Sequence, residues 1–302
     1  MEGITSYESE SSNFESQRLL VFLMSEEKDK KIRRLLKRDV EYCHQNQAFC
    51  FLPSLGLPVT TAGVSVLGKI QNILKQYGSL YYYIINIFAP VFPCKKFRNI
   101  VTEQIATHGS EAVILNLGSG PQILKGRNDI INVDIFAFNG VDIMADATDL
   151  PIEDDSVDLV ISVAMLEHVS CPIVVVDEIL RVLKPAGKVL AYVPFMVPFH
   201  AAPHDFHRWS KPGLIHLFRE YEVLEVGVGA GPTSGMLYVQ LEWIAMILSF
   251  GSKTVHDLLF LMFMIVCSPI KLLDIFLIKH PNAEKIASGF YILARKMSNS
   301  KR

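Results

Sequence analysis

Residues 113–121 read VILNLGSGP, an apolar run of the kind found in buried strands that leads into a glycine turn. Because glycine has no Cβ, Gly118 and Gly120 allow the turn to tighten and allow a ligand to approach the backbone. In open α/β sheets, ligands bind at the carboxyl ends of the strands. A GxG turn after a strand is a weak signal by itself, so the segments around it must be considered.

The next apolar run, residues 131–134 (INVD), ends in a carboxylate fourteen residues after Gly120. A carboxylate at a strand end can accept both hydrogen bonds of a ribose diol, although an isolated aspartate would more often cap a turn or a helix. A third segment, Ala145 to Pro151 (ADATDLP), follows, and then the acidic run before Val157. Three segments in this order are much more specific than any one of them.

Short β-type runs alternate with helical stretches on both sides of the glycine turn. This repeated alternation predicts a parallel sheet with helices on both faces. A helix is expected at Pro172–Leu183, and Lys184–Gly187 is expected to turn the chain into the next strand. The predicted strands are Ala112–Leu117, Ile130–Asp134, Val157–Val163, Lys188–Val193, Tyr221–Gly227 and Ser288–Ala294.

Together these segments resemble the class I S-adenosylmethionine-dependent methyltransferases, specifically the methyltransferase type 11-like group, over roughly residues 112–228. Val157–Val163 with Met165–Val169 (MLEHV) looks like the fourth strand and its turn, and Leu183–Lys188 looks like the LKPGG turn of this family. The resemblance implies an α/β fold with a Rossmann-like, seven-stranded, mostly parallel sheet that has helices on both faces. The residues outside this segment predict, in addition, a helical N-terminal extension and an apolar helical insertion before the last strand.

The resemblance also implies S-adenosylmethionine as the cofactor. Asp134 matches the acid that binds the ribose, and Asp146 matches the carboxylate that accepts from the adenine amine. The implied cofactor-binding residues are Asn116, Gly118, Ser119, Gly120, Asp134, Ile135, Asp146, Ala147 and Val163.

Two departures from the family pattern bear on the choice of cofactor. Asn116 stands where the family often has an acid, and the short spacing to Asp134 predicts that the first helix is reduced to about a turn or lost. NAD would need a third glycine at Ile123 and a helix N-terminus facing its pyrophosphate. S-adenosylmethionine carries no phosphate, so the missing helix favours it over NAD.

The proline-rich loop after the predicted strand at 188–193 concentrates titratable side chains. Methyl transfer to a hydroxyl or amine needs a proton acceptor, and His204 is the leading candidate. Asp205 would orient it or replace it, and His207 is third. For the substrate, the candidates are His200, Arg208 as a partner for an anionic group, and Trp209 as a cover over the site.

Structural roles for these loop residues are an equally weighted alternative. In that case Asp205 stabilises the loop and forms an ion pair with Arg208. A metal held by the three loop histidines is disfavoured because Pro203 interrupts a single helical face, so no metal site is predicted. The pair Glu167-His168, after the fourth strand, is a second candidate for base catalysis and ranks below the loop.

The rest of the chain divides by composition. The expected parts are a disordered leader at 1–25, a helical extension at 26–105, the cofactor-binding core at 106–228, an apolar insertion at 229–285 and the last strand and tail at 286–302. Within the extension, Glu26–Glu41 predicts a helix that packs on the domain or rests its basic face on acidic lipid. Residues 51–61 read as a loop, and 80–92 as a buried helix, an interfacial element or a lid.

The five cysteines are sparse and odd in number, so a reducing compartment is expected rather than a framework of disulfides. Cys43-His44 followed by Cys50 resembles half of a zinc site, but no second half completes it.

The apolar insertion explains most of the mean hydropathy of +0.29. Residues 258–270 are a thirteen-residue apolar run, whereas a membrane span needs about twenty. Extending the run would include Lys271 and Asp274, which are costly in hydrocarbon when unpaired. A helix pair in the membrane interface is therefore favoured over a single span, with a buried hairpin or a dimer interface as alternatives.

The predicted function is methyl transfer to oxygen or nitrogen of a small or lipid-linked acceptor, on the cytoplasmic membrane face. The alternative is a catalytically weak protein of the same fold that serves as a membrane-docked scaffold or partner. The net charge of −2 gives no basic field, so no nucleic-acid partner is expected, and the oligomeric state is left open.

Overall fold

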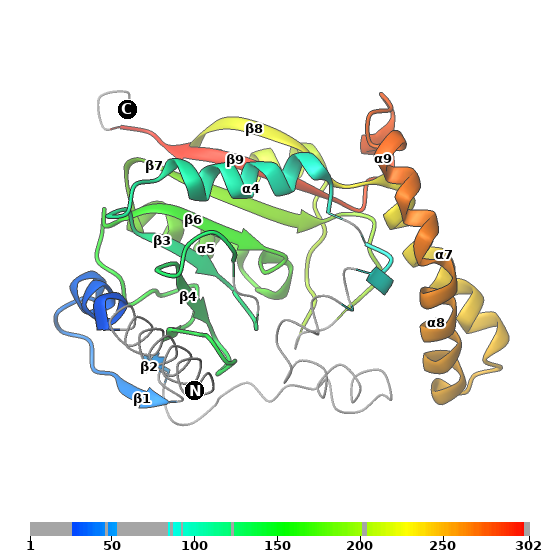
Figure 1. Ribbon diagram of the computed structural model, residues 1–302, viewed down its shortest axis with the longest axis horizontal. Helices are drawn as coiled ribbons and strands as arrows, with labels where there is room; N and C mark the ends of the chain where they lie inside the picture. Colours follow the sequence, from blue (N-terminus) through cyan, green and yellow to red (C-terminus); the bar gives the residue numbers. More distant parts are fainter. Residues whose placement is uncertain are drawn as a thin grey trace, which may run out of the picture.

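A nine-stranded sheet forms the centre of the protein (Figure 1). The computed structural model describes residues 26–45, 48–52, 84, 87–91, 93–121, 124–200 and 204–298. In these residues the strand order is β1-β2-β5-β4-β3-β6-β7-β9-β8. The strands are β1 (Cys43–Gln45), β2 (Ala48–Cys50), β3 (Ile114–Leu117), β4 (Ile131–Asp134), β5 (Ile143–Met144), β6 (Val157–Val163), β7 (Leu183–Pro194), β8 (Tyr221–Ala230) and β9 (Gly289–Lys296).

In this order, each pair of neighbouring strands from β5 through β4, β3 and β6 to β7 is parallel. β9 lies between β7 and β8 and pairs antiparallel with both. This confirms the predicted α/β class with a mostly parallel sheet. The predicted turn at 184–187 is a bulge within β7, because the register against β6 passes from Leu183 directly to Lys188. Ala186 adopts a φ of +65° in this bulge.

The strand count of seven was wrong, because the N-terminal extension is not purely helical. It contributes the hairpin β1–β2, and β2 pairs in parallel with the edge strand β5. Phe49 N donates to Asp142 O at 2.9 Å and Phe51 N donates to Met144 O at 2.9 Å, so the hairpin satisfies backbone groups that an edge strand would expose. Cys43 lies opposite Cys50, and all five cysteines, each in a described segment, are free thiols.

Helices cover both faces of the sheet, as predicted. On one face, α4 (Lys95–Thr107) packs Phe97 and Ile100 against Leu190 and Tyr192 of β7. The alternate residues of β7, including Val189 and Ala191, face the opposite side, where α5 (Pro172–Val182) and α6 (Lys211–Leu217) pack. This period-two alternation is what a strand covered on both faces requires.

The N-terminal helix covers residues 26–35 and ends earlier than the predicted residue 41. It ends there because Leu36 forms a β-bridge with Ile152. Ile32 and Leu35 are buried in the main core, while Lys28 and Lys31 form ion pairs with Asp142 and Asp129. The helix therefore packs on the domain, and two of its cations are engaged within the protein. The predicted leader, residues 53–61 of the predicted loop and most of residues 80–92 lie outside the described residues.

The apolar insertion forms a helical arm beside one end of the sheet (Figure 1). The arm consists of α7 (Pro232–Leu248), α8 (Lys253–Cys267), η3 (Ser268–Leu273), α9 (Asp274–Leu277) and η4 (Ala283–Lys285). It has a small core of its own, made by Leu237, Leu241, Ala245 and Phe260. Because α8 buries only Phe260 among its residues, the alternative of a buried hairpin that covers the sheet is wrong.

Lys271 and Asp274, the two charged residues that would be costly in hydrocarbon when unpaired, are hydrogen-bonded within the protein. The Asp274 carboxylate accepts from Thr233 N at 2.7 Å, from Ser234 N at 2.9 Å and from Ser234 Oγ at 2.7 Å. It thereby satisfies the first turn of α7, where negative charge is also favoured by the helix dipole. Lys271 Nζ donates to the carbonyls of Ile87 and Ala89, at 2.7 Å each.

Candidate functional site

The tips of β3 and β4 are joined by hydrogen bonds at the glycine turn. Gly118 and Gly120 have φ values of +69° and +54°, which residues with a Cβ rarely adopt. Gly118 N and Ser119 N donate to Val133 O at 2.8 and 3.1 Å. Gly120 N donates to Asp134 Oδ2 at 2.7 Å. The structure therefore brings together the turn and the carboxylate that the sequence placed in one site.

Asp134 is held rigidly in this position. Its other oxygen, Oδ1, accepts from Phe136 N at 2.9 Å, and the residue is only 9% exposed. A carboxylate can accept about four hydrogen bonds, and backbone N–H groups at Gly120 and Phe136 supply part of that number. A carboxylate held in this way can still accept from the two hydroxyls of a diol. Ile135 follows directly and is half-buried.

Two other predicted cofactor residues have structural hydrogen bonds. Asn116 is buried, and its Nδ2 donates to Asn132 Oδ1 at 2.9 Å, which links β3 to β4. Asp146 is exposed, and its Oδ1 accepts from Thr148 N at 2.9 Å and from Thr148 Oγ1 at 2.7 Å. The second arrangement is an Asx turn, which fixes the loop where the adenine is expected.

The remaining predicted cofactor residues lie near the same sheet edge. Ser119 is buried in the turn and donates to Gly120 O at 3.2 Å. Val163 ends β6 and is half-buried, as is Ala147 after β5. None of the described residues between β3 and β4, 118–121 and 124–130, is helical. This agrees with the predicted loss of the first helix.

Met165 is a site residue that the sequence did not reveal. A Cβ built on Gly118 would lie 2.2 Å from Met165 Cγ, so the Met165 side chain packs directly on the glycine turn. The chain reaches this position through Ala164, which has a φ of +54° and donates its N–H to Tyr192 O at 3.0 Å. Strained backbone of this kind is frequent at functional sites. The signal available in the sequence was the position of Met165 just after the predicted strand Val157–Val163.

Arg208 is fully used in holding the loop after β7. An arginine has five N–H donors. In Arg208, Nε donates to Val197 O, while the two terminal nitrogens donate to Pro198 O, His207 O and both oxygens of Asp205. No donor is left for an anionic acceptor, so the predicted substrate role of Arg208 is not supported.

Asp205 is equally committed to structure. Its side chain is 1% exposed, and Oδ2 also accepts from His200 N at 2.8 Å. Burial would by itself raise the pKa of Asp205, but the hydrogen bonds from Arg208 and His200 lower it to about 2. A carboxylate with so low a pKa is a poor base at neutral pH. The prediction of Asp205 as a catalytic base is therefore corrected to the structural alternative.

The other loop candidates line the surface next to η2 (Leu166–His168). The His204 ring is exposed, and its backbone carbonyl accepts from His168 Nδ1 at 2.6 Å. His207 places Nε2 at 3.2 Å from Ser170 O and lies against the Trp209 ring. The loop is thus seated on the turn that follows β6. Of the predicted catalytic residues, His204 retains the most exposed side chain.

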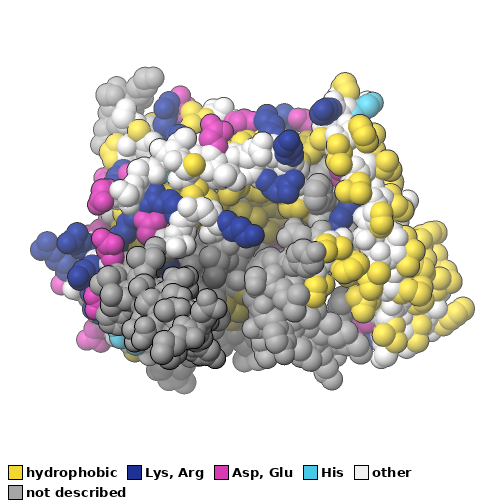
Figure 2. Space-filling model, viewed as in Figure 1, with side chains coloured by type: hydrophobic (Ala, Val, Ile, Leu, Met, Phe, Trp, Pro, Cys, Tyr) yellow, Lys and Arg dark blue, Asp and Glu magenta, His cyan; other side chains and the backbone are white. Residues whose placement is uncertain are grey.

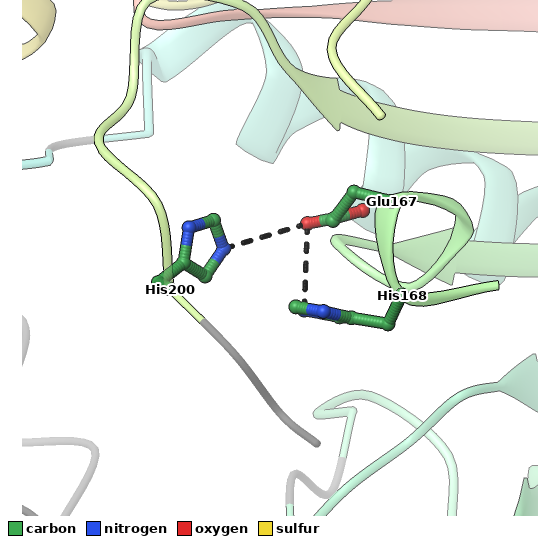
Figure 3. A group of neighbouring side chains, drawn as sticks. All are labelled: Glu167, His168 and His200. Atoms are coloured by element: carbon green, nitrogen blue, oxygen red, sulfur yellow. Dashed lines mark ion pairs between the residues drawn. The ribbon is translucent and has the colours of Figure 1, made fainter. Parts of the chain in front are cut away.

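A buried carboxylate between two imidazoles lies at the same place (Figure 3). Glu167 is 0% exposed, and the Nε2 atoms of His168 and His200 each lie 3.8 Å from its Oε1. Burial would lower the pKa of His200, but Glu167, the Pro198 carbonyl and Asp205 raise it above the usual value. The loop therefore brings His200 to the pair Glu167-His168, a grouping that the sequence did not predict.

Replacing Arg208 with alanine is expected to lower the free energy of unfolding by about 3 kcal/mol or more. The reason is that the Asp205 carboxylate would stay buried without its partner, which costs roughly 3–5 kcal/mol. Urea denaturation measures the change. Arg219→Ala, at an exposed pair with Glu220, is the control and should change stability by no more than about 0.5 kcal/mol. Unchanged stability of Arg208→Ala would contradict the structural role.

The comparisons with known proteins agree with this geometry. Residues 104–191 match a family described as a methyltransferase domain. The matched segment runs from the end of α4 to β7 and contains the glycine turn, Asp134 and η2. The segment of residues 104–191 belongs to the class I methyltransferases. S-adenosylmethionine is the cofactor of this family, and the residues at the tips of β3 and β4 fit an adenosyl group.

The chain is similar to demethylmenaquinone methyltransferase of Clavibacter sepedonicus, with 31% identity over 135 residues that cover 42% of this chain and 53% of that protein. It is also similar to an uncharacterized methyltransferase of Mycolicibacterium vanbaalenii, with 44% identity over 61 residues that cover 20% of this chain and 24% of that protein. The chain thus spans about half the length of the first relative.

Among solved structures, the chain is similar to 1,6-didemethyltoxoflavin-N1-methyltransferase of Burkholderia thailandensis. That structure contains 1,6-didemethyltoxoflavin and S-adenosylhomocysteine. The TM-score is 0.40 and the identity is 13%, over 80% of this chain and 94% of that chain.

Proposed function

We propose that this protein is an S-adenosylmethionine-dependent methyltransferase for oxygen or nitrogen of a small or lipid-linked acceptor, at the cytoplasmic face of a membrane. The observation that carries the proposal is the hydrogen bond between Gly120 N and Asp134 Oδ2. It fixes a turn in which Gly118 and Gly120 have no side chain beside a carboxylate, and this combination suits the ribose and backbone contacts of an adenosyl ligand.

S-adenosylmethionine supplies an electrophilic methyl group when bound. The protein has to hold the acceptor about 3–3.5 Å from that methyl and remove its proton. We assign the proton transfer to His204, whose exposed ring lies on the loop seated on η2. His207 is the second candidate. Trp209 supports the loop, since its backbone N–H donates to Pro194 O at 3.2 Å.

The membrane part of the proposal is supported by the apolar surface of the helical arm. Figure 2 shows hydrophobic side chains gathered over the α7–α9 end of the molecule. The helical segment Lys253–Leu277 is, by length and composition, long and apolar enough to cross a membrane. Its most apolar stretch has a mean hydropathy of 2.2, and only 22% of that stretch is buried in the protein. The most exposed apolar residues of the arm are Trp243, Met246, Phe250, Val266 and Phe276.

An interfacial position suits this arm better than a span. Phe250, in the turn between α7 and α8, is 94% exposed, and a helix pair with one packed side can bury such a tip in the acyl boundary. His256 and Glu242 also place a polar pair, 3.2 Å apart, between α7 and α8. A relative named demethylmenaquinone methyltransferase agrees with a quinone-like acceptor delivered from the bilayer.

Turnover tests the enzymatic proposal. Purified protein is incubated with membrane extract and S-adenosylmethionine carrying a labelled methyl group. We expect label in an extractable lipid or small molecule, and loss of at least about 100-fold of the rate in His204→Ala, since general-base catalysis contributes roughly 100- to 10,000-fold. Cofactor binding without any labelled product would instead support the scaffold alternative.

Vesicle flotation tests the membrane contact. Phe250→Glu and Val266→Glu are expected to reduce the bound fraction by about 10-fold, because each removes a side chain whose burial contributes roughly 1.5–3 kcal/mol. Val174→Glu, at an exposed apolar residue of α5 outside the arm, is the control and should float like the parent protein. Normal flotation of both arm variants, or loss of a dimer in place of loss of flotation, would contradict the membrane contact.

A further inference from the structure

The Glu167 carboxylate is buried, and its negative charge needs a compensating group. Both of its oxygens are buried, and neither has a hydrogen-bond partner among the described residues. A buried carboxylate without partners costs several kcal/mol, so native proteins provide such a group with a compensating partner or ion. The question is which group neutralises Glu167.

The two imidazoles next to Glu167 are oriented as acceptors toward it. His168 Nδ1 lies 2.6 Å from His204 O, and His200 Nδ1 lies 3.0 Å from Pro198 O. A carbonyl accepts only, so a proton on Nδ1 suits both contacts, and the Pro198 contact of His200 is shorter than the 3.3 Å between its Nδ1 and an Arg208 terminal nitrogen. In a neutral ring with the proton on Nδ1, Nε2 presents a lone pair. Figure 3 shows that both rings turn toward the Glu167 carboxylate, and the nitrogen nearest to it is Nε2 in each ring.

The distances fit a shared ion better than direct hydrogen bonds. The Nε2 atoms lie 3.8 Å from Glu167 Oε1, which is too long for a hydrogen bond. One ligand atom from each of the three residues lies within 4.8 Å of the others. Ligand atoms about 2.0–2.2 Å from a common ion are roughly 3–4 Å apart, so small shifts would complete the coordination.

We propose that Glu167, His168 and His200 bind one divalent first-row transition metal, with Zn²⁺ as the best-matched ion. Two imidazoles and one carboxylate are a zinc ligand set, and three protein ligands leave a position open for a substrate or water. The carbonyls that accept from both Nδ1 atoms are the outer-shell partners that metal-bound histidines require. This assignment replaces the expectation that the protein has no metal site.

The position of the site gives the metal a use. Met165 packs on Gly118 and is followed by η2, so the three ligands lie beside the proposed cofactor turn. A divalent ion with an open position can bind an acceptor oxygen and lower its pKa. This role rests on the proposed function, whereas metal binding itself does not.

Metal binding is measured on the full chain without cofactor, after removal of bound ions with a chelator. Calorimetric titration with Zn²⁺ is expected to show one tight site, and Co²⁺ should give d–d absorption bands of a site with nitrogen and oxygen ligands. His200→Ala and Glu167→Gln should weaken binding by at least about 100-fold, since loss of even an outer partner costs roughly 10- to 100-fold. His216→Ala, an exposed histidine on α6, should bind like the parent protein.

A measurement on the unmodified protein guards against misfolded variants. With ¹⁵N-labelled histidine, Zn²⁺ should shift the imidazole signals of two of the nine histidines at one equivalent. No saturable binding, shifts of other histidines, or full affinity in folded His200→Ala would overturn the proposal. In that case protonated imidazoles, and not a metal, neutralise Glu167. Methyl transfer that persists in the metal-free protein would leave the site standing and remove only its catalytic use.

Discussion

Gly118→Ala is expected to lose at least about 3 kcal/mol of unfolding free energy. An alanine at a φ of +69° costs roughly 1–2 kcal/mol in backbone strain, and the new methyl would lie 2.2 Å from Met165 Cγ, where overpacking adds about 1–3 kcal/mol. Thermal and urea denaturation measure the loss. Because Met165 precedes η2 directly, the variant should also disturb the loop seated there.

The matched control is Gly120→Ala. Its φ is also positive, at +54°, but a Cβ there has no atom within 4 Å, so only the strain of roughly 1–2 kcal/mol is expected. This variant should stay folded and bind the cofactor more weakly, because its methyl would occupy the space proposed for the ligand. Equal destabilisation by the two substitutions would show that contact with Met165 contributes nothing.

Asp134→Ala is expected to reduce the affinity for S-adenosylhomocysteine by at least about 100-fold. Hydrogen bonds to a charged group contribute roughly 1.5–3 kcal/mol each, and the carboxylate would accept two of them from the ribose diol. The variant also releases the N–H of Gly120, which loosens the turn. Calorimetric titration of folded protein measures the loss.

Asp142→Ala is the control for this substitution. Asp142 is a neighbouring carboxylate that also accepts from a backbone N–H, that of Asn132, at 2.7 Å. It lies before β5, and its side-chain contacts go to Asn132 and Lys28 rather than to the glycine turn, so its loss should affect stability but leave affinity within about 3-fold of the parent value. Parent-like binding by Asp134→Ala, or an equal loss in Asp142→Ala, would contradict the assigned site.

The cofactor edge could be predicted because its signals are local. An apolar run followed by glycines, and a second run that ends in Asp134, determine strand ends within a few residues of each motif. Parallel neighbours then bring both ends to one edge. The strand pattern of β7 and β9 was equally readable, because these strands are long and apolar.

The hairpin β1–β2 could not be predicted in the same way. Each strand has only three residues, and β2 pairs with β5, which lies more than ninety residues later. No periodicity develops over three residues, and the pairing partner is set by tertiary packing. The sequence of the hairpin also contains Cys43 and His44, which resemble half of a zinc site and gave no indication of a strand.

The roles of the side chains in the loop after β7 could be predicted only in part, because many of their hydrogen-bond partners are backbone atoms. Arg208 was expected to bind an acceptor, yet its donors go to carbonyls that only the folded loop brings into reach. In the same way, His200 meets Glu167 although thirty-three residues separate them. A list of titratable residues identifies the right loop, but it does not distinguish which side chains hold the loop and which face a ligand.

The central claim is that the tips of β3 and β4 hold an adenosyl ligand between the glycine turn and Asp134. A crystal structure of the full chain with S-adenosylhomocysteine tests it most directly. We predict both ribose hydroxyls within about 3 Å of the Asp134 carboxylate and the ligand against Gly120. Density for the ligand at another place, or a turn filled by protein side chains in the crystal, would contradict the account.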